Sequence, residues 1–446
     1  MTDMDQRGSF RGPTEADRAV AAVNRHAHAV DGPRDLDVLV DRLADADCVL
    51  LGESSHGTSE FYRWRAQLTA RLLRDYGFDF VAVEGDWTSC YEANRFVKDY
   101  PDAAPDARET LSAFDRWPTW MWGNWEMEGF FRWLHTLNDG RPVDEQAGFY
   151  GLDVYGLYES LEAVVDYLEE VDPEAAEEAR EAARCFEPYG RDAQRYARAL
   201  RTVPESCQEE VIDLLLDVRE RAATYGEATP DDRFDAEQNA LVTHNAEAYY
   251  RATVTAEENS WNVRDRHMTE TLNRLFDHHG DDAKGIVWAH NTHVGDARAT
   301  DMPQQDRINI GQLVREQETI GDTYVVGFGT HRGEVIAANS WGSEMRTKDV
   351  PPGRDGSYEH VFHHGDPENV LLFSDDLPDD GPLAEPRGHR AIGVVYHPNH
   401  EAGNYVPTVL PDRYDAFIHV DETGALHPVE LHPDRERIPE LYPHGL

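Results

Sequence analysis

The segment LGESSHGTSEF, residues 51–61, places a carboxylate and an imidazole three positions apart among small, turn-forming residues. Near pH 7 a neutral imidazole such as that of His56 can take a proton from water, and a neighbouring carboxylate fixes its tautomer and stabilises the imidazolium that forms. Glu53 is placed to be that carboxylate. The pair therefore has the residue types of a general base and its orienting group.

Polar side chains of the same kinds follow two other short apolar runs. Glu84 and Asp86 end FVAVEGD, and His290, Asn291 and His293 follow GIVWA. Short apolar runs that end in polar residues or glycine are typical of buried strands in a parallel sheet. Each polar residue taken alone is more often a helix cap or a hydrogen-bonded structural group. Because the carboxyl ends of parallel strands share one edge, where such sheets bind ligands, the repetition predicts a common cleft.

Two other kinds of chemistry fit this set of residues less well. Two histidines and two glutamates could ligate a catalytic metal, but H-E-x-x-H does not occur and the H-x-x-H at 290–293 is only moderately informative. A serine nucleophile in GESSHG fails the G-x-S-x-G pattern because His56 stands at the second glycine. We therefore favour water activated by a histidine, without metal or cofactor. A metal-dependent hydrolase using the same residues and a non-catalytic small-molecule-binding protein stay as alternatives.

The elements that must position these residues can be predicted from the spacing of apolar side chains. Residues 58–78 predict an amphipathic helix between the first two runs, which Thr58 or Ser59 can cap and Gly77 can end. Strand, helix and strand in this order indicate a βαβ unit and a mainly parallel sheet. The apolar residues of the helix stripe are Phe61, Trp64, Leu68, Leu72 and Tyr76.

The rest of the chain extends this pattern to an α/β fold with a mainly parallel central sheet flanked by helices. From about Pro173 to His279 the sequence is rich in Ala, Glu, Arg and Leu at helical spacing, which predicts a large all-helical insertion. We expect residues 1–12 to be mobile and residues 13–446 to form a single domain. Further strands are expected at 147–153, 323–329, 335–341, 369–373, 391–397 and 416–420.

The composition excludes several classes of partner. With 42 basic and 86 acidic residues the 446-residue chain has a formal net charge of −44, and its only lysines are Lys98, Lys284 and Lys348. Such a surface repels nucleic acid and anionic membranes. The 40% hydrophobic and 10% aromatic residues are too many for an acidic disordered chain. The pattern is typical of folded halophilic proteins, whose acidic surfaces stay hydrated in concentrated salt.

The cysteines and the apolar segments bear on location. Cys48, Cys90, Cys185 and Cys207 show no C-x-x-C spacing, so we expect reduced, structural thiols rather than a zinc knuckle or a disulfide framework. The start has no apolar signal core, and no stretch approaches the roughly 18 apolar residues of a membrane span. We expect a cytoplasmic protein without a membrane partner. The sequence does not indicate an oligomeric state.

These motifs together resemble the erythromycin esterase family, hydrolases that include macrolide-resistance enzymes. The resemblance covers nearly the whole chain and is carried by GESSHGTSEFYRWRAQLT, VAVEGDW, WPTWMW, FYGLDVY, SWNVRDRHM, VWAHNTHVGDAR and NIGQLVRE. It implies an α/β core with a helical insertion, a cleft at the strand ends and a small-molecule ester or lactone as substrate. Departures from the family pattern are Ser54 and Ser55, and His331 after GFGT, where an aromatic is common.

The resemblance also implies roles for individual residues. His56 would be the general base, with Glu53 and Glu84 orienting it and balancing its charge. Arg65 resembles a family active-site position and, with either histidine of HNTH, is expected to stabilise the oxyanion. Trp120 is one of four tryptophans at 117–125, which suit either a site for a large apolar or sugar-bearing ligand or the core. The residues expected to contact the substrate are Asp86, Trp87, Trp120, Asp153, Arg264 and Asn291.

The charge imbalance predicts a steep dependence of stability on salt. At an ionic strength of about 0.01 M the Debye length is roughly 30 Å, so acidic side chains repel one another across the molecule, whereas near 1 M it is about 3 Å. The Tm should therefore climb by many degrees between low salt and molar KCl or NaCl, which thermal unfolding followed by circular dichroism would measure. A Tm that stays flat over this range would show that a specific partner neutralises the acidic surface.

Overall fold

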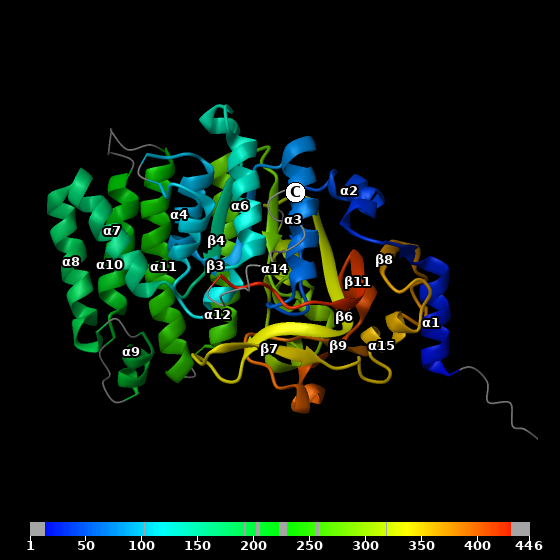
Figure 1. The fold of residues 1–446 in the computed structure, drawn as a ribbon. Coiled ribbons are helices and arrows are strands. Elements are labelled where there is room, and N and C mark those ends of the chain that lie inside the picture. Colours follow the sequence, from blue (N-terminus) through cyan, green and yellow to red (C-terminus); the bar gives the residue numbers. More distant parts are fainter. Residues whose placement is uncertain are drawn as a thin grey trace, which may run out of the picture.

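The computed structural model of the chain has a central sheet covered by helices on both faces, with a helical region beside one end of the sheet (Figure 1). It describes residues 14–101, 103–190, 193–201, 206–222, 230–255, 258–317 and 319–429. The amino-terminal residues 1–12, which we expected to be mobile, lie outside the described residues.

In the described part of the chain the sheet has nine strands, and its centre is parallel. The strands in spatial order are β1 (His28–Ala29), β8 (Val370–Phe373), β11 (Ala416–Thr423), β6 (Thr323–Ala338), β2 (Cys48–Leu51), β5 (Gly285–Trp288), β3 (Phe80–Asp86) and β4 (Gly148–Asp153), with β7 (Met345–Val350) beside β6. All neighbours from β11 to β4 pair in parallel, while β8 pairs antiparallel with β1 and β11, and β7 with β6. The predicted mainly parallel sheet is confirmed.

Alternate residues of the central strands point to opposite faces, so the same short runs fill two cores. In β2, Val49 and Leu51 pack on one face, and Cys48 and Leu50 pack on the other. The first face is covered by α2 (Asp37–Leu43), α3 (Ser59–Asp75) and α6 (Trp125–Asn138). The second is covered by α1 (Glu15–His26), α12 (Ser260–His279), α14 (Ile310–Glu316) and α15 (Tyr358–His363), while α4 (Trp87–Val97) contributes to both cores.

Helix α3 forms where the apolar stripe predicts it. It ends at Asp75, two residues before Gly77, whose φ of +71° suits glycine. Thr58 is the N-cap residue, but its hydroxyl hydrogen-bonds the Ser55 hydroxyl instead of the helix backbone. The start of the helix is thereby tied to the turn that carries Glu53. The buried residues of the stripe are Phe61, Trp64, Leu68 and Leu72.

The helical region lies between β4 and β5 in the chain. Its first helices, α7 to α11, share a core of their own, whereas α12 packs on the sheet through Met268, Leu272 and Leu275. The helical stretch therefore begins earlier than the expected Pro173, and its last helix is part of the layer over the sheet. The bounds are α7 (Leu157–Val171), α8 (Pro173–Phe186), α9 (Ala193–Leu200), α10 (Gln208–Ala222) and α11 (Pro230–Thr255).

The strand expected at 391–397 is wrong. Its residues make two isolated bridges, Ile392 with Ser55 and Val395 with Ala338, and these do not extend into a continuous ladder. In the chain this segment lies between two strands that form a separate antiparallel pair, β9 (Arg387–Arg390) and β10 (Tyr405–Thr408). The two strands expected at 323–329 and 335–341 are a single one, β6.

The expectation of four reduced thiols is wrong for one pair. Cys185 at the end of α8 and Cys207 just before α10 form a disulfide, while Cys48 and Cys90 are free and buried. Helix packing brings the Cα atoms of the pair to 5.8 Å across a sequence separation of 22, a distance normal for disulfides. Because disulfides are rare in reducing compartments, cysteine usage no longer supports a cytoplasmic location. No described helix is long and apolar enough to cross a bilayer.

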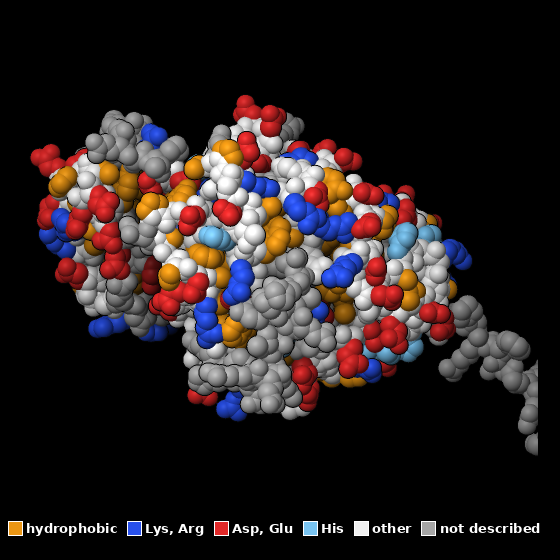
Figure 2. Space-filling model, turned by 45° about the horizontal axis from the view of Figure 1, so that its top comes forward, with side chains coloured by type: hydrophobic (Ala, Val, Ile, Leu, Met, Phe, Trp, Pro, Cys, Tyr) orange, Lys and Arg blue, Asp and Glu red, His pale blue; other side chains and the backbone are white. Residues whose placement is uncertain are grey.

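The surface charge is distributed as the composition suggests. Acidic side chains are spread over the face shown in Figure 2, on the helical region and on the sheet half alike. The three lysines are held by hydrogen bonds: Lys98 to Asp231 at 3.0 Å, Lys284 to the Ala44 carbonyl, and Lys348 to backbone carbonyls. Exposed positive charge in the described residues is therefore carried mainly by arginine.

Candidate active site

The turn after β2 holds Glu53 between His56 and Arg65. Nδ1 of His56 lies 2.9 Å from Oε1 of Glu53, and Nη2 of Arg65 on α3 donates to Oε2 at 2.5 Å. The Arg65 side chain is fully buried, with its guanidinium over the rings of Tyr62 and Trp288. Glu53 is thus fixed at both oxygens. When His56 is neutral, the Glu53 carboxylate keeps the proton on Nδ1, so the lone pair is on Nε2.

A second ionic cluster surrounds Arg264 of α12 at the ends of β3 and β4. Nη2 of Arg264 lies 2.7 Å from Oε1 of Glu84 and 2.6 Å from Oδ2 of Asp153, and Nε donates to Oδ1 of Asp153 at 2.9 Å. Nη1 lies 3.0 Å from Nε2 of His293. The guanidinium also lies over the Tyr155 ring, 5.0 Å from its centroid. One arginine from the helical region therefore joins the ends of two strands.

The two histidines after β5 both contact Glu84. The backbone N–H of His290 donates to Oε2 of Glu84 at 2.8 Å, and Nε2 of His293 lies 3.4 Å from Oε1. Nδ1 of His293 lies 2.9 Å from Oδ1 of the buried Asp265. Burial, with the neighbouring charge of His56, lowers the pKa of His290 well below its ordinary value of 6.5. His290 is therefore a neutral imidazole at physiological pH.

The buried charges shift the pKa values of His56 and Glu84 in opposite directions. Burial acts to lower the pKa of His56, but the carboxylates of Glu84 and Glu53 outweigh it, and the net shift is upward from 6.5. Burial acts to raise the pKa of Glu84, but His293, Arg264 and His56 outweigh it and hold that pKa well below 4.5. Glu84 is therefore an anion that favours the imidazolium form of His56.

A cavity of about 410 Å³ opens where these two clusters meet the helical region. Five of the candidate residues line it: His56, Glu84, Asp86, Asp153 and Arg264. Its size and apolar wall are those of a site for a drug-sized organic molecule. The aromatic residues of the wall are Phe114, Trp117, Trp122, Tyr155, Tyr249, Tyr250 and Trp341.

Several candidate residues lie away from this cavity. Trp87 and Trp120 are each 1% exposed and belong to the two cores, so neither lines the wall. Asn291 is fully buried and bonds the backbone of Phe328, which ties β5 to β6. Arg65 contacts Glu53 and does not line the cavity. Among the tryptophans at 117–125, Trp117 and Trp122 line the cavity, whereas Trp120 packs in the core.

Two charged residues of the site were not predicted. Arg116 lines the cavity and pairs with Asp86 through Nε and Oδ2 at 2.7 Å. Burial raises the pKa of Asp86 to about 6 in spite of this partner. Asp265 directly follows Arg264 in SWNVRDRHM, and its helical spacing from Trp261 and Met268, which puts it on an apolar face, was the signal that could have found it. The exposed Trp341 at the cavity mouth, packed on Trp117, had no comparable signal.

Metal-ligating side chains gather elsewhere. Among the described residues, one group of His, Cys, Asp and Glu has ligand atoms close enough together to hold an ion, namely His331, His363 and Asp421. None of the three lines the cavity.

A model of the family described as erythromycin esterase matches residues 73–423. The chain belongs to the erythromycin esterase family. The matched part includes Glu84, Arg264 and both histidines after β5, whereas Glu53, His56 and Arg65 precede its start. The protein YbfO of Bacillus subtilis (strain 168), which carries the name of a hydrolase, is 21% identical over 371 residues, which are 78% of this chain and 80% of YbfO. Membership and this relative support hydrolase activity.

Solved structures share the fold of this erythromycin esterase family member. A protein from Bacillus cereus has a TM-score of 0.74 at 17% identity, covering 93% of this chain and all of that one. A succinoglycan biosynthesis protein has a TM-score of 0.72 at 19% identity, covering 92% and 97%. The erythromycin esterase EreC in an open conformation has a TM-score of 0.64 at 17% identity, covering 88% and 94%.

The ionic cluster in this erythromycin esterase family chain predicts that Arg264→Met strongly destabilises the fold. Removing one partner of a buried charge cluster leaves Glu84 and Asp153 uncompensated, which costs about 3–5 kcal/mol. Urea unfolding in molar KCl would measure the loss. The matched control is Arg266→Met, two residues along the same helix, where the side chain is half-exposed and pairs with Glu258; it should cost about 1 kcal/mol or less. Equal losses in the two variants would contradict the assigned role of Arg264.

Proposed function

We propose that this protein hydrolyses an ester or lactone with water activated by His56. The observation that carries the proposal is the position of His56 on the cavity wall with its Nδ1 held 2.9 Å from Glu53. That arrangement presents the basic nitrogen Nε2 to the space where a substrate and a water would bind. Membership of the erythromycin esterase family supports the same reaction class.

In the proposed mechanism His56 Nε2 takes a proton from water as the water oxygen bonds to the carbonyl carbon of the substrate. The tetrahedral intermediate then breaks its bond to the alcohol oxygen, and the imidazolium returns the proton to that oxygen. The products are a carboxylic acid and an alcohol, or a ring-opened hydroxy acid from a lactone. Glu53 and Glu84 stabilise the imidazolium between the two proton transfers.

Two arginines support this reaction in different ways. Arg65 is fully buried and contacts Glu53, so it is a positioning residue that keeps the carboxylate oriented toward His56. It does not line the cavity, so we do not give it the oxyanion role that we expected from the sequence. Arg264 lines the cavity and supplies positive charge there.

The cavity wall supports a proposal for the substrate class. Aromatic side chains such as Trp117, Trp122 and Tyr155 offer a large apolar surface, and Asp86, Asp153 and Arg116 offer polar contacts. A cavity of about 410 Å³ fits part or all of a bulky organic ester. We propose a large apolar or sugar-bearing ester or lactone, with macrolide macrolactones as the first class to test.

The test is a panel of simple esters, small lactones and macrolides assayed in molar KCl, with mass spectrometry to detect the addition of one water. We expect water addition to at least one member of the panel. Binding without water addition to any member would overturn the proposal in favour of a non-catalytic binding protein.

The role of His56 predicts that His56→Asn folds but turns over substrate about 10²- to 10⁴-fold more slowly, the usual contribution of a general base. Asn keeps a polar side chain of similar reach but cannot accept the proton. The control is His364→Asn, an exposed histidine outside the cavity wall, which should retain full activity. Unchanged turnover in His56→Asn, with the Tm unaltered, would refute the mechanism.

The upward pKa shift of His56 predicts the acid limb of the pH profile. The base must be unprotonated to work, so kcat/KM should rise with pH and level off only above an apparent pKa that is higher than 6.5. Stopped assays across pH 5–9 in buffers of constant ionic strength would measure it. A plateau already reached at pH 6 would mean that another group with a lower pKa is the base.

A further inference from the structure

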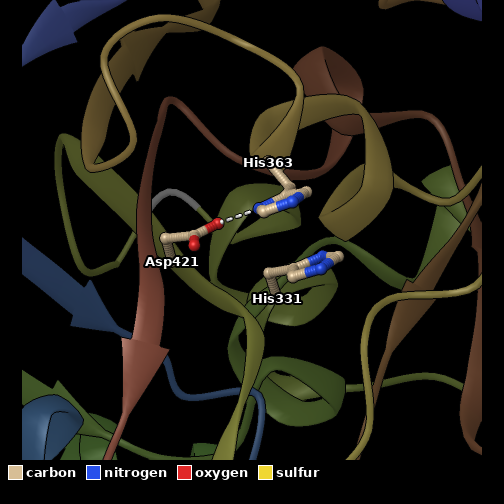
Figure 3. A group of neighbouring side chains, drawn as sticks. All are labelled: His331, His363 and Asp421. Atoms are coloured by element: carbon tan, nitrogen blue, oxygen red, sulfur yellow. Dashed lines mark hydrogen bonds and ion pairs between the residues drawn. The ribbon is translucent and has the colours of Figure 1, made fainter.

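Three side chains from three different elements gather at a place apart from the cavity (Figure 3). His331 comes from β6, His363 from the end of α15 and Asp421 from β11. Nδ1 of His363 lies 2.8 Å from Oδ1 of Asp421, and the two imidazole rings stack with centroids 3.7 Å apart. One ligand atom from each residue lies within 4.8 Å of the others.

The surroundings of the three residues resemble those of a metal site. Nδ1 of His331 lies 3.2 Å from the Glu359 carbonyl oxygen, the kind of contact that orients a metal-ligating histidine and leaves its other nitrogen for the ion. The backbone of Asp421 is anchored by its N–H, which donates to Asn369 Oδ1 at 2.8 Å. His331 and Asp421 are each 4% exposed, while His363 is partly open to solvent. An ion could therefore enter from the side of His363.

A fourth side chain lies next to the same carboxylate. His419 on β11 is fully buried, and its Nε2 lies 3.6 Å from Oδ1 of Asp421, the oxygen that also faces His363. Asp421 therefore has a histidine on two sides, and an ion that fixed this carboxylate would also fix the acidic neighbour of His419.

We propose that His331, His363 and Asp421 bind a divalent transition-metal ion of the zinc type. Two imidazole nitrogens and a carboxylate oxygen suit such ions and do not suit Mg²⁺ or Ca²⁺, which prefer oxygen ligands. Zinc bonds of about 2.0–2.2 Å in a tetrahedron separate ligand atoms by about 3.4 Å. The His331 and His363 rings are nearly parallel, so His363, which is partly exposed, must turn out of the stack before both nitrogens can face one ion at that spacing. Water would occupy the fourth position.

The ion would act on the fold and not on the substrate. It would bind β6, β11 and α15 together, in addition to the packing of Phe362 on Phe417 and the contact of His331 with the Glu359 carbonyl. Because the ligands come from distant parts of the chain, only the folded protein has the complete site. Binding therefore stabilises the native state in proportion to the free metal concentration.

The experiment is isothermal titration of the chelator-treated full chain with Zn²⁺ in molar KCl, together with Tm measurements. We expect one strong site per chain and a Tm that rises by a few degrees with Zn²⁺ but not with Mg²⁺. His363→Ala and Asp421→Asn should each weaken that site by more than the about 10- to 100-fold typical of outer-sphere changes. Anomalous scattering at the zinc edge should give a peak between the three side chains.

Two control variants separate this site from its neighbours. His360 on α15 and His364, the residue that follows the helix, have rings 4.3 Å apart and form an alternative ligand pair. His364→Ala should leave the strong site intact, as should His56→Asn in the cavity. The proposal is overturned if His363→Ala keeps the strong site, if His364→Ala removes it, or if Zn²⁺ binds only in the weak, many-site manner of an acidic surface.

Discussion

The candidate site depends on the ion pairs that the guanidinium of Arg264 makes with Glu84 and Asp153. Glu84 and Asp153 end neighbouring strands and face the same space, and two buried carboxylates there would be strongly destabilising without a cation between them. Arg264 contacts both, and it comes from α12, the last helix of the helical region. The connection from β4 through that region must therefore return over the sheet edge, which brings the aromatic residues of α11 to the wall of the cavity.

The pKa of His56, the proposed base, depends on this arrangement. Because the guanidinium of Arg264 pairs with Glu84 at 2.7 Å, the carboxylate can stay ionised in a buried place, and its negative charge acts on His56. Glu53 holds the same ring from the other side and is itself held by Arg65. Two separate carboxylate–arginine pairs thus flank one imidazole. Each pair is compensated locally, and their joint effect favours the protonated ring that a general base must form.

The fold and most of the strand-end residues could be predicted because both follow from local patterns. Short apolar runs identify buried strands, and parallel pairing carries Glu53, Glu84 and His290 to one edge whatever the length of chain between them. Side-chain direction could not be predicted in the same way. Trp87 directly follows the strand residue Asp86, yet it turns into the core while Asp86 faces the cavity. The disulfide was missed because helix packing, and not spacing, brings Cys185 to Cys207.

The charges of this protein fall into two populations that salt affects differently. The exposed carboxylates repel one another over a Debye length and are screened by molar salt, whereas the pairs around Arg264 and Arg65 are buried and are screened far less. Lowering the salt concentration therefore raises the free energy of the folded state through repulsion between exposed carboxylates. It does not weaken the buried ion pairs of the site. The geometry around His56 should persist in every molecule that is still folded, so a loss of activity at low salt is expected to follow the folded fraction and not precede it. Salt therefore changes the fraction of molecules that are folded, whereas the buried ion pairs determine the activity of each folded molecule.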